Sequence, residues 1–87
     1  MNKALKAVLL FLVNKRYIGG KHFSEEKLVK SRTKWLSKQE MKGFNEEYKK
    51  IKPFLIRLKK RTGKSSSWHI SIDPKCLSRI EEMLKLE

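Results

Sequence analysis

The spacing of apolar residues changes at Pro53 from a helical period to strict alternation. Before Pro53, apolar residues recur at steps of three and four, which places them on one face of a helix. After Pro53 they alternate with polar residues, as on a strand with one buried face. A proline also disfavours helix at the residue before it. The sequence therefore predicts an α+β fold, mainly helical, in which helices come first and a hairpin follows.

A first helix is predicted from Asn2 to Arg16, because its apolar residues have helical spacing and the Gly19-Gly20 pair disfavours continuation. Its buried face would carry Leu5, Val8, Leu9 and Leu12. Residues 22–23 offer a short extended piece. Ser24 can then cap a second helix over residues 25–30, whose glutamates lie in the first turn, where the helix dipole favours them.

Residues 31–36 are predicted to connect the second helix to a third, which has the strongest start signal in the chain. Ser37 and Glu40 form a capping box, in which each side chain accepts a hydrogen bond from the other residue's backbone. The third helix should run from Ser37 to about Lys52. Its apolar stripe would consist of Met41, Phe44, Tyr48 and Ile51.

Two antiparallel strands are predicted after Pro53. In the first, Phe54, Ile56 and Leu58 alternate with Leu55, Arg57 and Lys59. In the second, Trp68, Ile70 and Ile72 share one face, and we expect Trp68 to pack in the core with them. Residues 61–67 would form the turn. Asp73 can cap a last helix with Pro74 at its first position and Leu77, Ile80 and Leu84 on its apolar face.

This order of elements resembles the winged helix-turn-helix family over roughly Lys3 to Asp73. The resemblance implies that residues 37–52 are the recognition helix, that residues 57–67 are the wing, and that residues 17–23 supply a short strand beside the hairpin. The segment Ile18-Gly19-Gly20-Lys21-His22 and the stretch from Thr62 to Pro74 are also similar to small archaeal winged-helix proteins. One departure is the connection over residues 31–36, which is longer than the tight turn of the motif.

A single domain over residues 1–87 is expected, because no linker divides the chain. The 22 lysines and arginines exceed the 9 acidic residues and give a formal net charge of +13. This charge is uneven. Residues 57–64 hold five basic residues and no acid, whereas basic and acidic residues balance over residues 74–87. The asymmetry predicts a nucleic-acid partner rather than an evenly solvated surface.

Double-stranded DNA is the partner that we predict, bound by a transcriptional regulator or chromosomal protein that could form a homodimer. Lysines and arginines of the wing and turn would contact phosphates. Gln39 and Asn45 can bond adenine, and Lys42 can reach guanine. The candidate DNA-binding residues are Arg32, Lys34, Lys38, Gln39, Lys42, Asn45, Lys49, Arg57, Lys59, Lys60, Arg61 and Lys64.

Two other functions stay open. The first is an RNA-binding or ribosome-associated module, in which a basic wing follows the phosphates of an A-form helix. Trp35 could stack on a base in such a complex. The second is an interaction domain that binds an acidic protein within a larger assembly. Affinity for random duplex, and competition by structured RNA, would distinguish these functions from duplex DNA binding.

Catalysis, a cofactor and a metal site are not expected. The only thiol and imidazole groups are Cys76, His22 and His69, which do not supply the four ligands of a structural zinc site. Cys76 is expected to be an inert packed thiol, and His69 a solvated strand residue. Residues 7–13 form an apolar run too short to span a bilayer, and Lys15 and Arg16 follow where a signal peptide needs small residues. We therefore expect a cytoplasmic protein without membrane contact.

Overall fold

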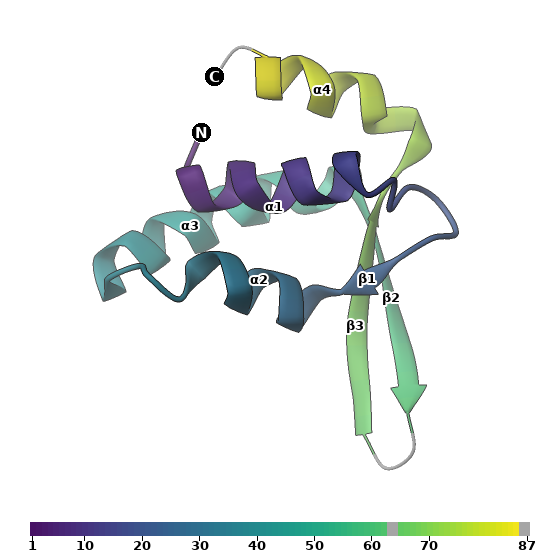
Figure 1. Ribbon diagram of the computed structural model, residues 1–87, viewed down its shortest axis with the longest axis horizontal. Coiled ribbons are helices and arrows are strands. Elements are labelled where there is room, and N and C mark those ends of the chain that lie inside the picture. Colours follow the sequence, from purple (N-terminus) through teal and green to yellow (C-terminus); the bar gives the residue numbers. More distant parts are fainter. Residues whose placement is uncertain (63–64, 86–87) are drawn as a thin grey trace.

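The computed structural model describes residues 1–62 and 65–85, which form a mostly helical α+β fold (Figure 1). The helices are α1 (Lys3–Asn14), α2 (Glu25–Thr33), α3 (Lys38–Ile51) and α4 (Leu77–Lys85), and the strands are β1 (Phe23–Ser24), β2 (Leu55–Thr62) and β3 (Ser65–Ile72). Short 3-10 turns, Lys52–Phe54 and Pro74–Cys76, precede β2 and α4.

Helix α1 lies between α4 on one side and α2 on the other, with α3 behind it in the view of Figure 1. The four residues expected on its buried face, Leu5, Val8, Leu9 and Leu12, are all buried, as predicted. Each fully buried aliphatic side chain of this kind contributes about 1.5–3 kcal/mol. The core continues into Leu28 of α2 and into Ile70 and Ile72 of β3.

The predicted capping box at the start of α3 is confirmed. The Glu40 backbone N–H donates to Ser37 Oγ at 3.2 Å, and the Ser37 N–H donates to Glu40 Oε1 at 3.1 Å. The predicted stripe is also confirmed, because Phe44, Tyr48 and Ile51 are buried and Met41 is half-buried. Residues only a few positions apart therefore determine where this helix starts and which of its faces is buried.

Helix α2 is longer than predicted. It continues to Thr33, so the predicted connection over residues 31–36 is wrong. The Ser31 and Thr33 hydroxyls donate to the backbone carbonyls of Leu28 and Val29 at 2.8 and 2.7 Å, which satisfies them inside the helix. Residues 34–36 and the Ser37 cap then form a short turn into α3. The connection from α2 to α3 is therefore shorter than predicted.

The three described strands form one antiparallel sheet in the order β1-β3-β2. The β2–β3 ladder runs from Leu55 opposite Ile72 to Thr62 opposite Ser65. The predicted turn over residues 61–67 is therefore too long, since most of these residues pair in the ladder. Only residues 63–64 remain between the strands, and they lie outside the described part. Serine is common in turns, so the three serines at residues 65–67 did not indicate that this part of the chain is a strand.

The short strand expected within residues 17–23 is displaced toward the second helix. The chain leaves α1 with positive φ at Arg16 (59°) and Gly19 (66°), and Ile18 forms an isolated parallel bridge with Ile72. Strand β1 then pairs Phe23 with Ile70 and Ser24 with His69. The segment does lie beside the hairpin, as the resemblance implies.

The two faces of the hairpin alternate, but Phe54 lies in the 3-10 turn before β2. The apolar set predicted for the buried face is also on the wrong side, because Leu55 is buried and Leu58 is 43% exposed. The register places Leu55, Arg57, Lys59 and Arg61 on the same face as Trp68, Ile70 and Ile72. Leu55, Ile70 and Ile72 are buried near the helices, whereas Trp68 is 43% exposed. The expectation that Trp68 packs in the core is therefore wrong. The hairpin extends beyond the helices (Figure 1). The exposed Trp68 pairs with Lys59, four positions along β2 from buried Leu55.

Helix α4 packs on α1 on the side of the molecule opposite the end of the hairpin (Figure 1). Asp73 Oδ1 accepts from the Lys75 backbone N–H at 2.9 Å, as expected of a cap, and Ile80 is buried. The start differs from the prediction, because Pro74 opens a 3-10 turn and the α-helix begins at Leu77. No helix of the described residues is long and apolar enough to cross a membrane.

Candidate nucleic-acid interface

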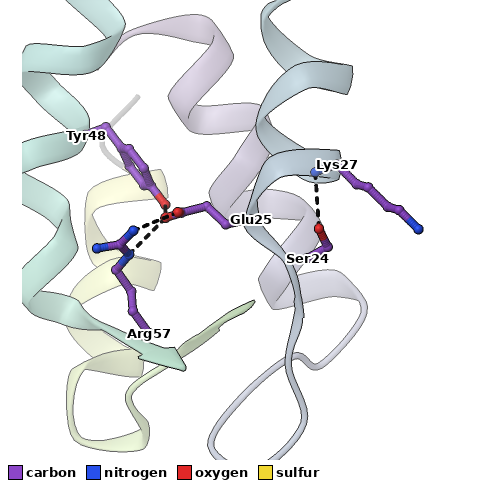
Figure 2. Close-up of polar contacts among 5 residues, drawn as sticks. All are labelled: Ser24, Glu25, Lys27, Tyr48 and Arg57. Carbon is purple, nitrogen blue, oxygen red and sulfur yellow. Dashed lines mark hydrogen bonds and ion pairs between the residues drawn. The ribbon is translucent and has the colours of Figure 1, made fainter. Parts of the chain in front are cut away.

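The hairpin is joined to the helices through one carboxylate, that of Glu25 at the start of α2 (Figure 2). Arg57 of β2 donates from Nη2 to Oε1 at 2.8 Å and from Nε to Oε2 at 3.1 Å. The Tyr48 hydroxyl of α3 donates to the same Oε2. The Arg57 and Glu25 side chains are 29% and 14% exposed. These contacts connect β2, α2 and α3 at one partly buried point.

The electrostatics of this junction favour an ionised Glu25. Burial alone raises its pKa, but hydrogen bonds from Arg57 and Tyr48 and the positive charges of Arg57 and Lys52 bring the pKa below its ordinary value of 4.5. Burial, followed by the hydrogen bond to Glu25, raises the pKa of Tyr48. The positive charge of Arg57 is therefore balanced within the fold. Sequence reasoning counted Arg57 as a phosphate contact and missed this partner, because Glu25 is 32 residues away.

Trp68 lies beside the junction on the helix-facing side of the hairpin. The Arg57 guanidinium is 4.6 Å from the centroid of its ring, and Lys59 Nζ is 6.0 Å from it. Lys59 and Arg61 are exposed on this face, and Lys60 is exposed on the other. Both faces of the hairpin are therefore basic, and one of them also presents an aromatic ring.

Four predicted residues of α3 form one exposed stripe. Lys38, Lys42, Asn45 and Lys49 follow one another at steps of four, three and four, and all are exposed. A groove between α2 and α3 is lined in part by Val29, Asn45 and Lys52. Of the stripe, Asn45 therefore borders α2. Gln39 falls on a different line of the helix, which it shares with Glu46 seven residues later. Gln39 is three residues before Lys42 and so lies at the edge of the stripe, on the side of Glu46.

Most of the glutamates near this surface have partners inside the fold. Glu47 is half-buried and accepts the Asn2 backbone N–H at Oε2 at 2.9 Å. Glu40 belongs to the capping box, and Glu26 forms an exposed ion pair with Lys30 at 2.9 Å. Glu46 is exposed. These contacts hold the carboxylates without cancelling their charges. Helix α3 therefore keeps only a small positive excess, with four lysines against three glutamates, whereas β2 has four basic residues and no acid.

The turn between α2 and α3 presents the most exposed large apolar side chain of the described residues. Trp35 is 82% exposed, and Lys34 Nζ is 4.9 Å from the centroid of its ring. Arg32 is half-buried, 5.4 Å from the centroid of the Phe11 ring, and donates to Ser31 Oγ at 3.1 Å. Arg32 is thus held against the protein, whereas Lys34 is exposed. Lys64, the remaining predicted residue, lies outside the described residues.

The two histidines are in direct contact, which sequence reasoning missed. His22 Nδ1 and His69 Nδ1 are 2.9 Å apart and form a hydrogen bond. The expectation that His69 is simply solvated is therefore wrong. Its partner precedes β1, which pairs with β3, so only the strand register could have revealed the contact. Cys76 is half-buried, and no group of three or more potential metal ligands occurs within residues 1–62 and 65–85.

The described residues thus present an exposed lysine stripe on α3 and a basic hairpin, and contacts through Glu25 link the hairpin to Tyr48 of α3. Exposed lysines and arginines of this kind can bind phosphates, and exposed tryptophans beside cations can bind bases. No family model, curated protein or solved structure matches the chain. The chemistry of this surface is therefore the basis for a functional proposal.

Proposed function

We propose that the chain is a winged helix-turn-helix domain that binds double-stranded DNA without catalysing a reaction. The order of helices and strands supports this proposal, and so does the short turn over residues 34–36, since helix-turn-helix motifs join their helices through three or four residues. Helix α3 would lie in the major groove, and the hairpin would contact the phosphate backbone. The protein would act as a transcriptional regulator or as a chromosomal protein.

The observation that carries the proposal is the junction of Arg57, Glu25 and Tyr48. Through it, the hairpin face with Lys59 and Arg61 is attached to the same point as the inner side of α3. Because this junction links α3 and the hairpin, both basic elements can contact the same duplex. Helix α3 has 14 residues and so a length of about 21 Å, enough to follow a major groove over several base pairs.

Binding would depend mainly on phosphate contacts from lysines and arginines, which displace counterions from the nucleic acid. Asn45 is the residue of the α3 stripe best suited to bond a base edge, because its amide can pair with adenine. Affinity would therefore be high for any duplex at low salt. Sequence preference would come from a small number of residues on α3.

A second candidate function is binding to RNA with unpaired bases. The exposed rings of Trp35 and Trp68, each within 6.0 Å of a lysine or arginine, favour it. Aromatic rings beside cations stack on unpaired bases, which a regular duplex does not offer. The two tryptophans lie on different elements, in the turn before α3 and on β3.

Competition binding separates these functions. A labelled duplex of random sequence is titrated with the protein at several salt concentrations and then competed with unlabelled duplex or structured RNA at matched salt. If about six phosphates are contacted, the logarithm of the binding constant falls with the logarithm of the salt concentration at a slope of about −5. Stronger competition by RNA would favour the second candidate. Undetectable affinity for both nucleic acids at about 150 mM salt would exclude them and favour an acidic protein partner.

A further inference from the structure

The two histidines meet among positive charges. His22 lies just before β1 and His69 on β3, and their rings are half-buried. The register places His69 opposite Leu58 of β2, on the face of the sheet opposite Trp68. Lys60 lies two residues after Leu58 on the same face of the sheet as His69. The Lys27 backbone N–H donates to Oγ of Ser24, which pairs with His69, and the charges of both lysines act on His69. The site therefore combines two imidazoles with two exposed lysines, which come from the strand and the helix next to it.

The hydrogen bond between the rings determines what their other nitrogens can do. In the neutral pair one Nδ1 donates and the other accepts, so one ring carries a proton on Nε2 and the other has a free lone pair there. Adding one proton to that lone pair keeps the Nδ1–Nδ1 hydrogen bond intact. Both Nε2 atoms are then donors, and the pair carries a positive charge. Protonation thus converts a mixed donor and acceptor into two donors, the arrangement that suits an anion.

The surroundings oppose this protonation as long as no anion is present. Burial, the His22 ring and the charges of Lys60 and Lys27 lower the pKa of His69 below its ordinary value of 6.5. A bound oxyanion would offset the repulsion and accept hydrogen bonds from the rings. Binding of an anion and uptake of a proton should therefore favour each other.

We propose that His22, His69, Lys27 and Lys60 form a phosphate-binding site that takes up a proton when it is occupied. Its ligand is a phosphate oxyanion, supplied by the backbone of the bound nucleic acid. The site itself stands on the contact between the two rings and on the positions of Lys60 and Lys27 next to His69 in the sheet and at the start of α2. Only the assignment to a nucleic-acid backbone rests on the proposed function.

The first test uses inorganic phosphate and does not involve nucleic acid. The ring C–H signals of the two histidines are followed by NMR against pH, in chloride and in phosphate at equal ionic strength. Phosphate should raise the titration midpoints by about half a pH unit or more. The double variant Lys27→Gln/Lys60→Gln should lose this shift, and its His69 midpoint in chloride should rise. Lys3→Gln/Lys85→Gln removes the same charge from exposed positions on α1 and α4 and should keep the shift.

Midpoints of the parent chain that do not respond to phosphate would overturn the site, and so would a full shift in Lys27→Gln/Lys60→Gln. The four substituted lysines are exposed, so folding should be retained, and circular dichroism checks it.

The second test compares duplex affinity at about pH 8 and pH 6, where one linked proton should give about a threefold or larger gain in affinity at the lower pH. The gain should vanish in His22→Gln/His69→Gln. An equal gain in that variant would exclude the nucleic-acid backbone as the ligand. If duplex does not bind at either pH, the proposed function fails, and the phosphate test still decides the site.

Discussion

Arg57 and Glu25 form a two-point ion pair across the boundary between the hairpin and the helices, with Nη2–Oε1 and Nε–Oε2 distances of 2.8 and 3.1 Å. The same arginine lies 4.6 Å from the centroid of the Trp68 ring. One side chain therefore fixes the base of the hairpin and orients its exposed aromatic residue. The hairpin can thus present its basic face in a defined direction relative to α3.

Replacing Glu25 by glutamine should destabilise the fold. The variant leaves Arg57 partly buried without its counter-charge and weakens the acceptor for Tyr48, so the free energy of unfolding should fall by about 1–3 kcal/mol. Urea denaturation measures this change. Glu26→Gln is the matched control, because it removes the neighbouring carboxylate from an exposed pair and should have little effect. Equal losses in the two variants would contradict a special role for Glu25.

Stability should fall at acidic pH through Glu25. Its pKa is lowered in the folded state, so the unfolded chain binds more protons near its ordinary pKa of 4.5. The stabilisation is therefore fully present above that value and is lost as pH falls through the lower folded-state pKa. Urea denaturation at several pH values should show the parent chain and Glu25→Gln converging in stability below about pH 4. A constant difference down to about pH 2 would show that the ionised carboxylate is not what stabilises the fold.

His69 should add a second pH dependence at higher pH. Because its pKa is lowered in the folded state, stability should decline as pH falls below the ordinary value of 6.5. Thermal unfolding in chloride between about pH 8 and pH 5.5 measures this decline. The decline should be smaller in His69→Gln. A parent chain equally stable across this range would show that the histidine contact does not disfavour protonation.

The exposed cations of the hairpin should determine much of the salt dependence of nucleic-acid binding. Changing Lys59, Lys60 and Arg61 to glutamine should weaken binding to all sequences alike and make the slope of log K against log salt about 3 units less negative. The control variant changes Lys3, Lys75 and Lys85, three exposed lysines of α1 and the C-terminal segment. It should keep most of the slope. An equal change in both variants would mean that only net charge matters.

Sequence preference should depend on Asn45 more than on Gln39, because Asn45 lies between Lys42 and Lys49 of the lysine stripe and Gln39 lies at its edge, toward Glu46. A preferred duplex is first selected from a random pool. Asn45→Ala should then reduce the preference for that duplex over random sequence by about 1–3 kcal/mol while leaving the salt slope unchanged. Gln39→Ala, the matched amide, should have a smaller effect. The reverse order would place a different side of α3 against the bases.

Local signals in the sequence were sufficient for the helices but not for their exact ends. The capping box of Ser37 and Glu40 and the stripe of Phe44, Tyr48 and Ile51 each depend on residues within a few positions of one another. Thr33 falls within the connection predicted over residues 31–36. Its hydroxyl bonds to the helix itself, and its burial against the core lets α2 continue.

Contacts between distant segments could not be derived in this way. Alternation places Trp68 on the same face as Ile70, but it does not reveal where along the hairpin the helices stop covering that face. The contacts between Arg57 and Glu25 and between His22 and His69 join residues 32 and 47 positions apart. Both depend on the packing of the sheet against α2. The candidate cations were visible in the sequence, but the partners that hold some of them were not.

The sheet order β1-β3-β2 leaves β2 paired on one side only within the described strands. An open strand edge of this kind is a template on which a further chain can add, the first step of amyloid-like association. Lys59, Lys60 and Arg61 lie along the outer part of this edge. Their charges should repel the same edge of an identical molecule. The lysines and arginine that attract a polyanion would thus also help to keep the protein from aggregating.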